Sequence, residues 1–461
     1  MKSLMQRTSK GRVLYIGVSY YNNWYLSREL RRLGWAADVF TYSAENADLY
    51  RHGHDYALKD YEDLEHKYYY SKYIDIFLQK LFLTFYRFAA NNRRHPHLYQ
   101  FKRILKRCLL YNRLILKNLL RLFLKSMGKT QLKELEPLFN VLDHYDILHF
   151  AGVNNLRYFY FFNPGLFGSM PVEWDIKLLK HFGKKIVYSN TGCLDGVSQS
   201  SFRTWPPEPV CDICRWRDVP MVCSDDRNLK WGRIRNSLVD YQITLGGNRK
   251  DYNDDPRVHE VPEFYCLDPK VWNPDLSVPP RYKLSLPDDT VKIFHAVGNF
   301  ELRTKKNNRN IKCTHIYVPI IKRLKAEGYK VELIFFNNIP NKELRFYQVQ
   351  SDIFADMLTL GFFGATAREG MMLGKPVICF LRAEWLESMR GEIPEYVDEL
   401  PIISATPDTI YEVLKDLVEH PEKRQEIGRR SREFALKWHS AEAGAKRLDQ
   451  IYSDLLVGVK K

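Results

Sequence analysis

Several features of membrane, secreted and redox proteins are missing from this sequence of 461 residues. No apolar run approaches the roughly 20 residues that a membrane-spanning helix needs, and the polar N-terminus lacks the apolar core of a signal peptide. Eight cysteines are too few and too unevenly spaced for a disulfide framework. No G-x-G-x-x-G follows the first strand-like run, which argues against nicotinamide or flavin binding. We therefore expect a cytoplasmic protein that does not cross the membrane.

The apolar pattern predicts two successive α/β units, each with its own series of strands and helices. In the first unit, strands are predicted at 13–18, 36–41, 146–150, 185–189 and 241–245. A polar, proline-rich stretch at 268–289 is typical of a linker. In the second unit, the pattern predicts strands at 291–295, 330–336 and 376–380 and helices at 314–326, 364–373, 408–419, 422–437 and 441–456.

This alternation predicts a Rossmann-like domain over residues 1–280, interrupted at about 50–138 by a largely helical basic insert. A second Rossmann-like domain is expected over 281–440, followed by a last helix over 441–461. Crevices form at the C-terminal ends of parallel strands, so a ligand is expected in the cleft between the two units.

The most specific stretch runs from 352 to 378. A loop with Gly361 and Gly364 leads into a helix that carries Glu369 in its second turn. Backbone N–H groups at such a helix start, here at Ala365 and Thr366, can bind a diphosphate, and a glutamate can accept hydrogen bonds from ribose hydroxyls. A packing turn with a surface glutamate is the alternative.

This stretch resembles the nucleotide-sugar motif of the family-four group of retaining GT-B glycosyltransferases. In that motif a glutamate, seven residues and a second glutamate precede a Met-Ala-x-Gly-x-Pro-Val run. Glu369 matches the second glutamate, while Gly374, Pro376 and Val377 match the run. Gly361 stands where the family has its first glutamate, which contacts the donor sugar there. The resemblance therefore leaves open how the sugar is recognised.

The segment from 294 to 315 resembles the family's strand, loop and Arg-x-x-Lys-Gly-Thr pattern. Arg309 and Lys312 match the arginine and lysine that hold the diphosphate, with Cys313 in place of the glycine. Paired cations would stabilise the charge that the diphosphate gains as it leaves. His295 and Asn299, in the same segment, are assigned to the donor site. A solvated basic loop is the alternative.

The chain contains no Asp-x-Asp, the pattern by which the other main glycosyltransferase fold holds a divalent metal on the diphosphate. Neutralisation by Arg309 and Lys312 would make such a metal unnecessary. The resemblance therefore implies catalysis without a metal cofactor.

The acceptor is expected against loops that follow the strands of the first unit. His149, Asn154, Asn190 and Thr191 lie at such positions. Family members often place a histidine near the reacting sugar, and His149 is the candidate for that catalytic role. A structural role explains each of these residues equally well.

Four cysteines have the spacing of a structural zinc site. Cys211-x-x-Cys214 is followed by Cys223, and Cys193 lies eighteen residues upstream of Cys211. A bound zinc would brace the loop and do no chemistry. The alternative is a set of reduced cysteines in an aromatic loop.

The positive charge is concentrated in the insert. Residues 72–129 hold fourteen Lys and Arg against one acidic residue, a net of +13 that leaves +2 of the formal +15 for the rest of the chain. Within the insert, Arg113, Lys117, Arg121 and Lys125 recur every fourth residue beside an apolar stripe. Such a surface can bind anionic lipid, at about 1 kcal/mol per basic residue. An amphipathic helix packed on its own domain is the alternative.

We therefore expect a retaining GT-B hexosyltransferase that moves a sugar from a nucleotide-diphosphate donor to a lipid-linked or membrane-borne glycan, at the inner face of the cytoplasmic membrane. One alternative is a nucleotide-sugar epimerase of the same fold. The other, a basic nucleic-acid-binding protein, is disfavoured because the charge is confined to one apolar-striped segment.

Overall fold

The computed structural model describes residues 9–16, 21–41, 52–57, 144–151, 176, 179–180, 183–190, 198–208, 210–214, 216–220, 223–244, 255–262, 266–298, 300–304 and 309–458. The predicted basic insert lies outside these ranges except for 52–57. The predicted site residues that also lie outside are Arg113, Lys117, Arg121, Lys125, Asn154, Thr191, Cys193 and Asn299.

The first α/β unit is built on a parallel sheet of seven strands in the order β3-β2-β1-β4-β5-β6-β7. The strands are β1 (Arg12–Ile16), β2 (Ala36–Thr41), β3 (Tyr56–Ala57), β4 (Ile147–Ala151), β5 (Lys185–Ser189), β6 (Tyr241–Thr244) and β7 (Val258–Glu260). Among the described residues of this unit, the helices are α1 (Asn22–Arg32), α9 (Gln199–Phe202), α10 (Val210–Ile213) and α11 (Asp225–Leu238). The central strands β1, β4 and β5 are almost entirely buried, as expected for a parallel sheet covered on both faces.

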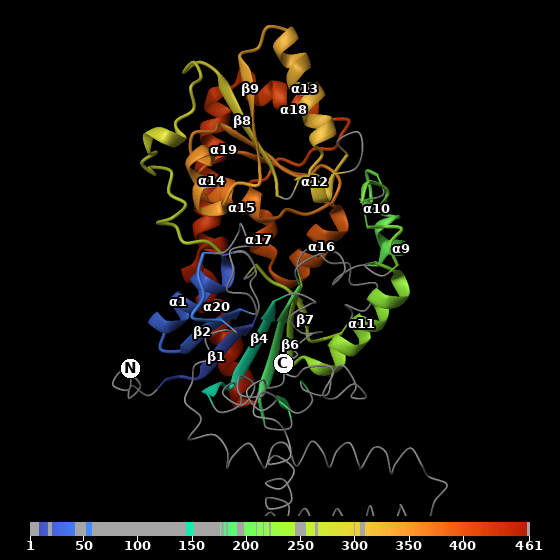
Figure 1. The fold of residues 1–461 in the computed structure, drawn as a ribbon, viewed down its shortest axis with the longest axis vertical. Helices are drawn as coiled ribbons and strands as arrows, with labels where there is room; N and C mark the ends of the chain where they lie inside the picture. Colours follow the sequence, from blue (N-terminus) through green and yellow to red (C-terminus); the bar gives the residue numbers. More distant parts are fainter. Residues whose placement is uncertain are drawn as a thin grey trace, which may run out of the picture.

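The second unit has a parallel sheet of four strands in the order β11-β10-β8-β9. Its strands are β8 (Val291–Val297), β9 (Val331–Asn337), β10 (Ile353–Ala355) and β11 (Val377–Ile378). A 3-10 helix, η3 (Pro280–Tyr282), precedes β8. The α-helices are α12 (Phe300–Arg303), α13 (Thr314–Ala326), α14 (Asn341–Gln348), α15 (Ala365–Met372), α16 (Ala383–Glu392), α17 (Pro394–Asp398), α18 (Ile410–Glu419) and α19 (Pro421–His439). Figure 1 shows the two units one above the other.

The last helix, α20 (Ala441–Val457), returns from the second unit to the first. Its buried face, which includes Ala445 and Tyr452, belongs to the core of β1, β2 and α1. Trp35 Nε1 donates a hydrogen bond of 2.7 Å to Asp449, which also pairs with Lys10 at 2.9 Å. Figure 1 shows α20 beside α1, so the C-terminus of the chain is part of the N-terminal core. None of the described helices has the length and apolar character needed to cross a bilayer.

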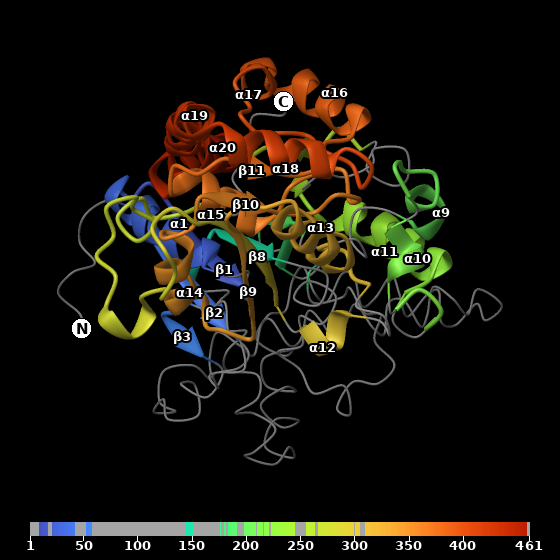
Figure 2. The ribbon, with the colours of Figure 1, turned by 90° about the horizontal axis from the view of Figure 1, so that it is seen from above.

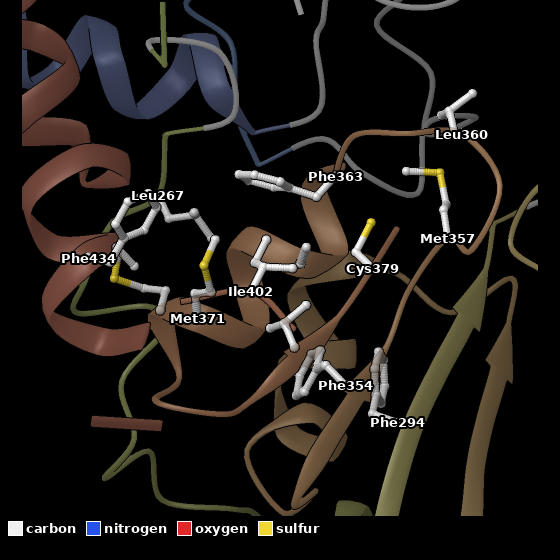
Figure 3. Close-up of a cluster of buried hydrophobic side chains, with 14 of the residues drawn as sticks. Leu267, Phe294, Phe354, Met357, Leu360, Phe363, Met371, Cys379, Ile402 and Phe434 are labelled. Carbon is white, nitrogen blue, oxygen red and sulfur yellow. The ribbon is translucent and has the colours of Figure 1, made fainter. Parts of the chain in front are cut away.

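The two units share a hydrophobic cluster around α15. Figure 3 shows its centre, where Phe294, Phe354 and Met371 pack beneath Phe363. Aromatic residues of the first unit, among them Trp205, belong to the same cluster. Seen from above, α15 lies near the middle of the molecule, over the strands of the first unit (Figure 2). The start of α15 is therefore close to the junction of the two units.

Candidate functional site

The N-terminus of α15 is shaped by the loop 361–364. Gly361 has φ +86°, a left-handed conformation that a glycine adopts without strain. Arg368 Nη1 holds the loop by donating hydrogen bonds to the carbonyls of Phe363 at 2.8 Å and Gly364 at 3.0 Å. No side chain caps the helix at Gly364, and Ala365 and Thr366 are only partly buried. Because the first N–H groups of a helix have no partner within it, this start can bind an anion.

Lys312 places a positive charge at the same point. A Cβ added to Gly364 would lie 3.9 Å from Lys312 Nζ. The ammonium group forms an ion pair with Asp356, whose side chain is fully buried, while 14% of the Lys312 side chain is exposed. Asp356, which follows β10, was not predicted from the sequence to be a site residue. Its carboxylate fixes the lysine where a diphosphate at the helix start would meet it.

A tight turn before α13 positions Lys312. The Asn310 Oδ1 atom accepts a hydrogen bond of 3.0 Å from the Lys312 N–H. Cys313 follows with φ +63°, in the left-handed region, although it is not glycine. This conformation costs roughly 1 kcal/mol or more for a residue with a side chain. The turn therefore holds Cys313 in a conformation that normally favours glycine.

Arg309 contacts the other unit. Its Nη2 atom donates a hydrogen bond of 3.3 Å to Oε2 of Glu208, which lies between α9 and α10. The two side chains are 41% and 32% exposed, so this ion pair contributes little to stability. No local pattern in the sequence marks Glu208, because the contact joins residues that are far apart in the chain. Arg309 therefore lies at the junction of the units.

Glu369 is not a surface residue. It is 2% exposed, so the alternative is wrong in placing this glutamate at the surface. Oε1 accepts a hydrogen bond of 2.9 Å from Asn341, and Oε2 accepts one of 2.6 Å from Gln348. Burial raises the pKa of the carboxyl, and the hydrogen bonds from Gln348, Asn341 and Tyr21 oppose that rise. The carboxylate thus links α15 to α14.

The same network reaches the first unit. His52 Nε2 lies 2.7 Å from Asn341 Oδ1, and His52 Nδ1 lies 2.7 Å from the Tyr25 hydroxyl. Burial is the main reason that the pKa of His52 falls to about 4, so the ring is neutral at physiological pH. Side chains from both units therefore surround the helix that carries Glu369.

The two predicted site histidines lie inside the sheets. His149 on β4 contacts the Tyr452 hydroxyl through Nδ1 at 2.6 Å and the Ser189 hydroxyl through Nε2 at 2.7 Å. His295 on β8 contacts the Ala355 carbonyl at 3.0 Å and the Thr314 hydroxyl at 2.9 Å. Burial lowers the pKa of His149 to about 3 and, with other effects, that of His295 to about 4. Each ring joins neighbouring elements through both nitrogens, which differs from the contact with a sugar or donor that the sequence suggested.

Asn190, predicted on the acceptor side, lies just after β5. Its Nδ2 atom donates to the Thr244 hydroxyl at 3.0 Å, and its Oδ1 accepts from Gln242 at 3.1 Å. The residue is 2% exposed. In this arrangement it connects the ends of β5 and β6.

The zinc prediction finds no support among the described residues. Within them, no group of three or more His, Cys, Asp or Glu side chains comes together as a metal site. Cys211, Cys214 and Cys223 are free thiols, and burial is the main reason that the pKa of Cys211 rises to about 12. Cys223 Sγ instead accepts a hydrogen bond of 3.2 Å from Gln199. The spacing that suggested zinc here belongs to cysteines engaged in local packing.

The architecture matches a known structure over nearly the whole chain. Sucrose-phosphate synthase from Thermosynechococcus elongatus aligns with 97% of this chain and 100% of its own, at 14% identity and a TM-score of 0.51. The fold is GT-B.

A weaker likeness is found to HepE from Anabaena in complex with UDP-glucose, at 11% identity and a TM-score of 0.46, over 96% of this chain and 100% of that chain. Another is found to the catalytic domain of starch synthase IV from Arabidopsis thaliana bound to ADP and acarbose, at 10% identity and a TM-score of 0.47, over 97% of this chain and 99% of that chain. No protein family and no curated protein is matched by the sequence. Identities this low establish the fold and nothing finer.

Proposed function

We propose that this chain is a glycosyltransferase that takes a sugar from a nucleotide-diphosphate donor. The observation that carries the proposal is the position of the Lys312 ammonium beside the uncapped start of α15, at the junction of two Rossmann-like units of a GT-B fold. Backbone N–H groups, together with a lysine that is ion-paired to a buried aspartate, form a site suited to a diphosphate.

The same charges fit the chemistry of transfer. As the bond between sugar and diphosphate breaks, negative charge grows on the leaving phosphate, and a preorganised cation stabilises that charge. Lys312 is held by Asp356 before any substrate arrives, so it need not reorganise during the reaction. Arg309 is the second proposed cation, released from Glu208 when a donor binds. With two cations at the phosphate, we propose that catalysis needs no metal.

The finer assignments rest on the sequence. The resemblance to the family-four enzymes implies a hexosyl donor and retention of the anomeric configuration. It also implies that Glu369 contacts the ribose, and each of its carboxylate oxygens can accept a further hydrogen bond beside the one from Asn341 or Gln348. The cationic insert supports an acceptor carried by a membrane, such as a lipid-linked glycan.

Nucleotide sugars are expected to stabilise the protein against heat. A ligand at 100 times its dissociation constant adds about 2.7 kcal/mol to the free energy of unfolding. We would screen uridine, guanosine, adenosine and thymidine diphosphates and their sugars by thermal unfolding, with Lys312→Gln as the matched control. Protection of the wild type is expected, with a smaller protection of Lys312→Gln because its affinity for the diphosphate is weaker, and no protection of the wild type by any of these ligands would refute the proposal. Product analysis without an acceptor separates transfer from epimerisation.

Binding to anionic vesicles tests the proposed membrane acceptor. Replacing Arg113, Lys117, Arg121 and Lys125 by glutamine should release the protein from vesicles that contain phosphatidylglycerol, because each basic residue contributes about 1 kcal/mol near the surface. Binding of the wild type should weaken with salt. Donor binding in the second unit should not change. A wild-type protein that ignores such vesicles at low salt would contradict the membrane assignment.

A further inference from the structure

Arg382 fills the space beside Gly361. This arginine directly precedes α16, and its N–H donates a hydrogen bond of 2.9 Å to the Gly361 carbonyl. A Cβ added to Gly361 would lie 2.8 Å from Arg382 Cβ and 3.4 Å from both Cδ and Nε. Cys379, three residues earlier, donates its thiol to the Phe362 carbonyl at 3.5 Å, which ties the two segments together. Figure 3 shows Cys379 close to Phe363 of this loop. A long cationic side chain thus lies along the loop that leads to α15.

The buried side chain of Arg382 has an unpaired donor within the described part of the chain. The residue is 5% exposed, and its Nε atom has no partner among the described residues. The nearest carboxylate is that of Glu384, 3.8 Å from Nη1 and 56% exposed, which is beyond hydrogen-bond distance. A guanidinium carries five N–H donors, and leaving them unsatisfied in a buried place is costly. The position therefore suits a ligand that brings acceptors.

Trp205 determines which side of the guanidinium can bind a ligand. The Arg382 Cζ atom lies 3.5 Å from the centre of the Trp205 ring, which itself packs on Phe202 at 4.4 Å between ring centroids. The indole covers one face of the guanidinium, so its edge is left for binding. That edge presents the parallel N–H donors that match a carboxylate. Trp205 belongs to the first unit and Arg382 to the second, so this contact also bridges them.

One buried carboxylate acts on Arg382 from further away. Burial lowers the pKa of Arg382, and the negative charges of Glu384 and of Glu260, a fully buried residue at the end of β7, partly oppose that fall. Glu260 therefore offsets part of the buried charge of Arg382.

The loop places Arg382 at a distance suited to the sugar. Lys312 lies at Gly364 and Arg382 at Gly361, and three residue steps span at most about 11 Å. A diphosphate at the first point and an acidic group at the second would therefore lie close enough to belong to one nucleotide sugar. We propose that Arg382 binds a carboxylate on the transferred sugar, so that the donor is a nucleotide-linked uronate or a similar acidic sugar. This inference rests on the proposed glycosyl transfer.

Matched donors test this proposal. The probes are nucleotide-linked glucose and glucuronate, and mannose and mannuronate, which differ within each pair only by a carboxylate in place of CH₂OH. Calorimetry on the wild type should show the acidic member binding about 10- to 100-fold more tightly, as expected for a charged hydrogen-bonded pair. Arg382→Gln should lose that preference while its affinity for the nucleoside diphosphate alone is kept. Arg382→Lys keeps the positive charge but loses the parallel N–H donors of the guanidinium, so it should retain part of the preference for the acidic donor.

Arg309→Gln is the matched control, because a change at the diphosphate should weaken both members of a pair alike. Should Arg382→Gln fail to fold, Arg382→Lys and the wild-type preference still decide the matter. The proposal is overturned if the wild-type protein binds the neutral donor as tightly as the acidic one, or if the preference for the acidic donor survives in Arg382→Gln. It is also overturned if a preference for a carboxylate appears only when the carboxylate is on the acceptor. A wild-type protein that binds no nucleoside diphosphate overturns the proposed function, and this inference with it.

Discussion

Lys312→Ala is expected to lower kcat by about 100- to 1,000-fold, the usual effect of removing one preorganised group that stabilises a developing anion. Donor binding should weaken much less, because the charge on the phosphate is greatest in the transition state. Steady-state kinetics with the donor found by thermal screening, together with calorimetry, separate the two effects.

The buried partner of Lys312 complicates the single variant. Asp356 is fully buried, and removing one member of such a pair costs about 3–5 kcal/mol of stability because the remaining charge is unpaired. The double variant Lys312→Gln/Asp356→Asn removes both charges and keeps amide groups of similar size. It should recover much of the stability while turnover stays low. Wild-type turnover in this double variant would place the diphosphate elsewhere.

Much of the second unit was predictable from the sequence because its signals are local. The helix α13 (Thr314–Ala326) was predicted with its observed bounds, as was the strand β5 (Lys185–Ser189) of the first unit. Both are apolar patterns that end at glycine or polar residues, so neighbouring residues suffice to define them. The helices α11, α14 and α16 were not predicted. The sequence of α14 is only weakly apolar, and its contacts are with distant segments. Its Asn341 donates a hydrogen bond to Glu369 and also contacts His52 of the first unit.

The side-chain contacts of the site were harder to predict because they join distant segments. The pattern around Gly361 shows that a side chain is missing there, but only the fold reveals that Arg382 occupies the space. For His149 the position on a strand was clear. Whether its ring faces a cleft or a helix depends on α20, which returns from the end of the chain to contact it through Tyr452.

Glu369→Ala should destabilise the protein, although the sequence suggested a carboxylate that contacts ribose hydroxyls. Its two oxygens accept hydrogen bonds from the buried amides of Asn341 and Gln348. Each donor left without a partner costs about 1–3 kcal/mol, so a loss of roughly 2–6 kcal/mol for the two donors is expected in urea denaturation. Glu332→Ala, which removes only a surface ion pair with Lys325, is the control and should change stability by about 1 kcal/mol or less.

The pH dependence of the unfolding free energy tests whether the Glu369 carboxyl titrates abnormally in the folded protein. Burial raises the pKa of Glu369 above its ordinary value of 4.5, so the folded protein binds a proton at pH values where the unfolded chain has lost it. Stability contributed by this group therefore falls as the pH rises from about 4.5 through the raised pKa. Glu369→Gln cannot titrate, so the difference in unfolding free energy between it and the wild type should change across that range in favour of the variant. A difference that stays constant with pH would show that the carboxyl titrates normally, and that Glu369 is more accessible to water, and to a ribose, than its two amide partners imply.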